Sequence, residues 1–142
     1  MSTDQERHAA GLRARREVLG DAHVDRAQTT AGAFSHDFQD FITRYAWGDV
    51  WSRDGLGRRE RSLITLALLA GLGRDDELQL HIRGALNNGV TSDEIGEVLL
   101  QTAVYAGVPA ANAAFAIAQR VLDELRGLDP APRTTERPTV EG

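Results

Sequence analysis

The chain has 142 residues, the length of one ordinary domain, and with 42% hydrophobic and 26% charged residues it has the composition of a globular protein. Its formal net charge is −5 and it contains no cysteine, which argues against a nucleic-acid partner and excludes disulfides, thiolate metal sites and thiol nucleophiles. No apolar run approaches the roughly 20 residues that cross a bilayer, and the N-terminal segment has no signal-peptide core, so we expect a cytoplasmic protein with no membrane partner.

Helical periodicity recurs along the whole chain, whereas strand signals are nearly missing. We therefore expect an all-α fold, a single-domain bundle of about six to seven helices. The first half of the chain predicts helices over 4–19, about 22–30 and 35–47, with Ser35 as the N-cap of the third. Residues 47–57, "WGDVWSRDGLG", combine glycines, aspartates and two tryptophans and are predicted to form a loop.

The most apolar segment of the chain comes next. Residues 58–73 become apolar on all sides after Ser62, which predicts the central, buried helix of the bundle. Another helix is predicted over 74–88 and ends at "NNG", where Gly89 suits the left-handed conformation that closes a helix.

The C-terminal part is predicted from its helix-start signals. A capping box over 91–94 opens one helix, and Pro109 is well placed to begin the last. The expected domain covers 1–126. The tail over 127–142, with three of the four prolines and few hydrophobic residues, is predicted to be disordered.

The alanine-rich stretch over 101–119, "QTAVYAGVPAANAAFAIAQ", has a consequence for assembly. Small side chains let helices approach closely, but they leave more flat apolar surface than a chain of this length readily buries. Such surfaces are often covered by another subunit. We therefore expect a homo-oligomer, a trimer or hexamer, and the alternative is a tightly packed monomer.

Three stretches carry a resemblance to a known family: "RYAWGDVW" (44–51), "RSLITLALLAGLGR" (61–74) and "ELQLHIRGALNNGVT" (77–91). They lie within a match that runs from about Glu6 to Arg126, nearly all of the expected domain. This part of the chain resembles the carboxymuconolactone decarboxylase family, which belongs to the alkylhydroperoxidase D-like superfamily. The resemblance implies the all-α fold of that superfamily.

Redox members of the superfamily carry a Cys-x-x-Cys-x-x-x-His motif, and its histidine falls on His81 in this sequence. The two cysteine positions hold Arg74 and Glu77 instead. Thiol peroxidase and disulfide chemistry are therefore excluded, and the resemblance implies a decarboxylase. The alternative is a non-catalytic or different-substrate helical module of the same superfamily.

The implied reaction converts 4-carboxymuconolactone, a small-molecule dicarboxylate lactone, to 3-oxoadipate enol-lactone and CO2 in protocatechuate catabolism. Loss of CO2 sends an electron pair into the conjugated lactone carbonyl and forms a dienolate. Because the substrate contains its own electron sink, no cofactor is expected. The protein must bind two carboxylates, stabilise charge at the carbonyl oxygen and deliver one proton to carbon.

His81 is the candidate proton donor, because an imidazole gives up and recovers a proton near neutral pH. Glu77, one helical turn earlier, is expected to orient or charge the ring. The alternative is that His81 is a helix contact satisfied by Glu77 or a carbonyl. The pair could also bind a metal, but no third ligand stands at a matching spacing, so no metal is expected.

Substrate-binding residues are chosen by charge and position. All 16 basic residues are arginine, and Arg58 and Arg61 stand at the start of the apolar helix, where the helix dipole also attracts anions. Trp47 is either a wall of the pocket or a core anchor. The remaining polar candidates are His36 and Asn88, whereas His8 and His23 are expected to be peripheral.

Overall fold

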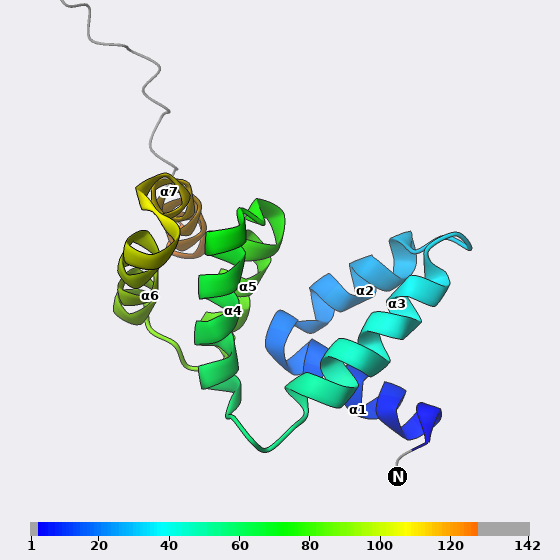
Figure 1. Ribbon diagram of the computed structural model, residues 1–142. Coiled ribbons are helices and arrows are strands. Elements are labelled where there is room, and N and C mark those ends of the chain that lie inside the picture. Colours follow the sequence, from blue (N-terminus) through cyan, green and yellow to red (C-terminus); the bar gives the residue numbers. More distant parts are fainter. Residues whose placement is uncertain (1–2, 128–142) are drawn as a thin grey trace, which may run out of the picture.

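The computed structural model describes residues 3–127, and within that range the protein is all-α, with no strand (Figure 1). The elements are α1 (Asp4–Leu19), α2 (Asp21–Thr30), α3 (His36–Ile42), the π-helix η1 (Thr43–Trp51), α4 (Arg58–Leu72), α5 (Asp75–Asn87), α6 (Ser92–Ala106) and α7 (Val108–Leu125). The predicted fold class is thus confirmed. The tail over 128–142 lies outside the described residues.

Several helix ends follow directly from local sequence. Thr91 accepts a hydrogen bond from the backbone N–H of Glu94, whose carboxylate accepts one from the N–H of Thr91, which confirms the predicted capping box. Gly89 follows α5 with a φ of 86°, a conformation that glycine adopts without strain. Ser35 precedes α3 as predicted, but its side chain makes no capping hydrogen bond.

The helices form two packed groups that meet at α1 and α5. Figure 1 shows α1, α2 and α3 on one side, α6 and α7 on the other, and α4 and α5 between them. The larger core cluster is formed by the four helices from α4 through α7 and includes Leu66, Ile82 and Leu99. The smaller one joins α1 to η1 through Val18 and Trp47. None of the helices within 3–127 has the length and apolar character needed to cross a membrane.

The prediction of a loop over 47–57 is wrong for its first five residues, because η1 continues to Trp51. The reason is a close crossing of α1 and η1 at two glycines. A Cβ on Gly48 would lie 2.5 Å from the carbonyl oxygen of Arg7. A Cβ on Gly11 would overlap the carbonyl oxygen of Thr43. The two backbones touch here, and the carboxylate of Asp49 accepts two hydrogen bonds from Arg7, at 2.8 and 2.5 Å.

The prediction that α4 is buried on all sides is also wrong for the single chain. Leu66 and Ala70 are in the core, but Ile64, Leu68 and Leu72 on the opposite face are exposed. An apolar groove of about 470 Å³ lies between this face and α6. Residue type alone predicted burial, and the structure shows that one apolar face of α4 has no cover within the described chain.

Candidate active site

The side chain of His81 lies against two aromatic rings supplied by η1. Its ring centroid is 6.2 Å from that of Trp47, with planes only 7° apart, and 6.1 Å from that of Trp51. The tryptophan rings stack on each other at 5.0 Å. Because η1 is pinned to α1 at the glycine crossing, the walls around the imidazole are held by the fold and not by a flexible loop.

The imidazole of His81 is largely removed from water and has no hydrogen-bond partner at Nδ1 among the described residues. Burial and, to a smaller extent, the nearby charge of His23 lower the pKa of His81 to about 4, and only Glu77 opposes the shift. His81 is therefore neutral at pH 7 in the ligand-free protein. An unsatisfied polar atom in such a place is costly and is a common feature of functional sites.

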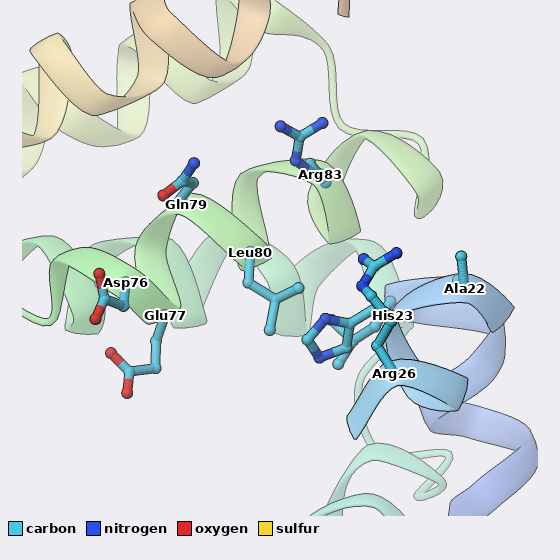
Figure 2. Close-up of a pocket in the computed structure, with 10 residues that line it drawn as sticks. Ala22, His23, Arg26, Asp76, Glu77, Gln79, Leu80 and Arg83 are labelled. Atoms are coloured by element: carbon cyan, nitrogen blue, oxygen red, sulfur yellow. The ribbon is translucent and has the colours of Figure 1, made fainter. Parts of the chain in front are cut away.

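Glu77 is on the same helix as His81 but makes no hydrogen bond to it within residues 3–127. Its side chain is exposed and lines a cavity of about 500 Å³ between α2 and α5. Figure 2 shows His23 and Arg26 of α2 on one side of this cavity and Glu77 and Leu80 of α5 on the other. The alternative in which Glu77 satisfies the imidazole is not what the structure contains.

His23 does not occupy the peripheral position that the sequence suggested. It is half-buried, and its imidazole points from α2 toward α5, into the cavity. Burial, followed by the charges of Arg15 and Arg26, lowers the pKa of His23. No sequence signal reveals this position, because it depends on how α2 packs across α5.

The two arginines chosen from the sequence differ in their surroundings. Arg58 pairs with Glu17 of α1 at the surface, so its charge is already partly neutralised. The Nε atom of Arg61 is buried and has no hydrogen-bond partner among the described residues. Of the two, Arg61 has the donor that remains available to an anionic ligand.

Asn88 and His36 also have partners of their own. The amide of Asn88 donates to the hydroxyl of Ser62 at 2.9 Å and, weakly, to the carbonyl of Arg58 at 3.5 Å. His36 is exposed at the start of α3, with Asp37 and Asp40 as its acidic neighbours. The structure therefore brings Trp47 to His81 but gives His36 no contact with this cluster.

Residues 3–127 contain no group of three His, Cys, Asp or Glu side chains that could hold a metal ion. The described residues offer a neutral, aromatic-walled imidazole and, at the start of α4, the buried Nε donor of Arg61, which has no partner among them. Such groups suit acid–base chemistry on an anion.

Fold and site thus define an all-α protein with a cysteine-free imidazole site. The chain belongs to the carboxymuconolactone decarboxylase family, whose model matches residues 36–120. It is 51% identical over 127 residues to a 4-carboxymuconolactone decarboxylase of Acinetobacter baylyi, covering 89% of this chain and 94% of the relative. It is also 44% identical over 115 residues to a nitrosuccinic acid decarboxylase of Metarhizium robertsii, covering 81% and 80%.

Proposed function

We propose that this protein is a cofactor-independent carboxy-lyase that converts 4-carboxymuconolactone to 3-oxoadipate enol-lactone and CO2, in the cytoplasm and within protocatechuate catabolism. The observation that carries the proposal is His81, a largely buried imidazole whose Nδ1 has no hydrogen-bond partner among residues 3–127, in a chain that shares 51% of its aligned residues with a 4-carboxymuconolactone decarboxylase. The absence of lysine and cysteine from the sequence is compatible with this chemistry, which needs neither a Schiff base nor a thiol.

The bond that breaks joins a carboxylate to the ring carbon that also bears the ring oxygen. Its electron pair moves through the adjacent C=C bond into the lactone carbonyl, so CO2 leaves and a dienolate remains. The dienolate then takes one proton at the ring carbon next to the carbonyl. His81 is the proposed donor of that proton, and the aromatic walls formed by Trp47 and Trp51 would exclude water from the reacting ring.

A neutral imidazole must first acquire the proton that it donates. The substrate carries two negative charges, and an opposite charge placed within several ångströms of an imidazole raises its pKa. Binding would therefore raise the pKa of His81 and allow it to take up a proton. When CO2 leaves, its negative charge remains on the dienolate, whose ring carbon next to the carbonyl then accepts that proton from His81. Glu77, whose charge already favours protonated His81, is proposed to assist from the cavity.

Carboxylate binding is assigned to arginine, since its planar fork matches a carboxylate. Arg61 is the first choice of the sequence-derived pair, because its buried Nε has no partner among the described residues. Arg58 is the second and would have to share its charge with Glu17. Asn88 is proposed to act by positioning the start of α4 through Ser62, and His36 is retained only as a substrate contact that would need closure of α3.

A second candidate substrate follows from the Metarhizium robertsii relative, which is named for nitrosuccinic acid. That compound is also a dicarboxylate, and its nitro group accepts an electron pair as the lactone carbonyl does. The same imidazole and arginine donors would therefore serve either reaction. A different dicarboxylate with an internal electron sink is the alternative to 4-carboxymuconolactone.

We also propose that the protein is a homo-oligomer, a trimer or hexamer. The support is the uncovered apolar face of α4, which continues across the groove to α6, where Tyr105 is 85% exposed. Leu68 lies on the α4 side of this groove at 56% exposure. Large exposed apolar patches usually mark contacts between proteins, and a second copy of the same chain would supply the same alanine-rich helices.

The experiment that tests the proposed function compares kcat/KM for 4-carboxymuconolactone and nitrosuccinate, with chelator present and CO2 and product measured together. A large preference for the lactone, with one CO2 and one enol-lactone formed per substrate consumed, supports the proposal. A preference for nitrosuccinate would reassign the substrate. No CO2 from either compound would leave a helical module without this activity.

A further inference from the structure

Arg15 of α1 is a buried arginine without a counterion. Only 6% of the residue is exposed, and its Nε has no hydrogen-bond partner among the described residues. Its single side-chain hydrogen bond within 3–127 runs from Nη2 to the amide oxygen of Gln39, at 3.1 Å. Gln39 is neutral, so nothing in the described chain balances the charge.

Two other arginines of the same helix, Arg7 and Arg16, have carboxylate partners. Arg7 bonds to Asp49, and Arg16 bonds to Asp21 and Asp25, and these carboxylates raise the pKa of both arginines. For Arg15, burial lowers the pKa, and no carboxylate opposes it. Taking an ion out of water without a partner is strongly unfavourable, and natural proteins rarely leave such a group without a purpose.

The position of Arg15 connects it to His81. Its charge is close enough to His23 to lower the pKa of that imidazole, and the charge of His23 in turn acts on His81. His23 also lines the cavity between α2 and α5, together with Arg26 (Figure 2). The packing gives the same connection: Ala14 and Val18, which flank Arg15 on α1, lie in one core cluster with Trp47, and the ring of Trp47 stacks on that of His81.

We propose that Arg15 binds one carboxylate of the substrate, which would balance its buried charge. The proposal rests on the proposed function and extends it, because Arg15 is not one of the arginines that the sequence indicated for substrate binding. A carboxylate that reaches Arg15 would accept from the free Nε–H, remain beside the amide of Gln39, and place the rest of a small dicarboxylate near His23 and His81.

The test is the pair of variants Arg15→Met and Arg13→Met. Arg13 lies two residues earlier on α1 and is exposed, so its variant controls for loss of a positive charge. Removing one partner of a buried charge pair typically lowers affinity by ~30-fold or more. We expect Arg15→Met to raise KM for 4-carboxymuconolactone and lower kcat/KM by that factor, with Arg13→Met unchanged. Wild-type kinetics in Arg15→Met would overturn the proposal.

A second readout separates ligand binding from a structural role. Adipate, an unreactive dicarboxylate, should raise the Tm of the wild type but not that of Arg15→Met. Without adipate, Arg15→Met should be at least as stable as the wild type, because an unbalanced buried charge has been removed. An equal adipate shift in both proteins would contradict the proposal.

The test remains decisive if Arg15→Met does not fold or if the wild type is inactive. If Arg15→Met does not fold, Arg15→Lys keeps the charge but loses the fork; a raised KM and a smaller adipate shift in that variant support the proposal, and values equal to wild type refute it. If the wild type does not decarboxylate 4-carboxymuconolactone, the proposed function fails, but the adipate shift still decides whether Arg15 binds a carboxylate.

Discussion

The unusual state of His81 gives a prediction about stability that does not depend on the substrate. In the folded protein, burial first and then the charge of His23 lower the pKa of His81 to about 4, from 6.5 in an unfolded chain. Between those two values the unfolded chain binds a proton that the folded protein does not. Acid therefore favours unfolding in this pH window.

The size of the effect follows from the shift. Each pKa unit corresponds to about 1.4 kcal/mol, so lowering the pH from 7 to 4 should remove about 3 kcal/mol of the free energy of unfolding through His81. This contribution of His81 to the free energy of unfolding is fully present above pH 6.5 and is lost as the pH falls toward 4. For a domain whose total stability is about 5–15 kcal/mol, this is a large fraction.

The assay is urea unfolding of the wild type and His81→Gln at several pH values from 7 to 4. Other acidic and basic groups titrate in both proteins, so the difference between the two curves isolates His81. We expect the wild type to lose about 3 kcal/mol relative to the variant across this range. A constant difference, or an imidazole NMR titration with a midpoint near 6.5, would refute the reasoning that His81 is buried without a partner.

Three further perturbations test the surroundings of the site. Trp51→Ala should admit water and move the NMR-measured pKa of His81 upward from about 4, and an unchanged midpoint would show that Trp51 does not shield the ring. Gly48→Ala should lower the free energy of unfolding by about 2 kcal/mol in urea titration, because the new methyl group meets the backbone of α1. The control is Gly32→Ala, where the new methyl group has open space. Equal losses in the two variants would contradict the close contact between α1 and η1. Leu68→Glu should reduce the mass measured by light scattering, and an unchanged mass would exclude the α4–α6 groove as the subunit contact.

Much of the fold could be predicted because helix limits are set locally. A capping box over 91–94, a glycine at 89 and a proline at 109 each act on neighbouring residues, and the observed helices begin and end near them. The π-helix could not be predicted in this way. It depends on Gly11 and Gly48 meeting across two helices, and no local pattern in "WGDVW" shows that contact.

The residues of the site also separate into those that local sequence predicts and those that depend on tertiary contacts. Spacing placed Glu77 and His81 on one helix. Trp47, which the sequence left open as a pocket wall or a core anchor, lies against His81 in the structure. The burial of Arg15 could not be predicted, because it belongs to a polar, arginine-rich helix whose sequence pattern gives no reason to bury it. Its burial comes from the way α1 packs against η1, α5 and α2, and its one hydrogen-bond partner among the described residues, Gln39, lies 24 positions later in the chain. Contacts of this kind appear only after the fold has been assembled.

In the proposed decarboxylation of 4-carboxymuconolactone, His81 donates the proton to the ring carbon of the dienolate. The most direct measurement is CO2 release and enol-lactone formation by the wild type, His81→Ala and the control His8→Ala, with helicity and oligomer size checked for each. We expect rapid turnover by the wild type and His8→Ala, and a loss of about 100-fold or more in kcat for His81→Ala, typical of a removed general acid. Equal turnover by the wild type and a well-folded His81→Ala would contradict this role of His81.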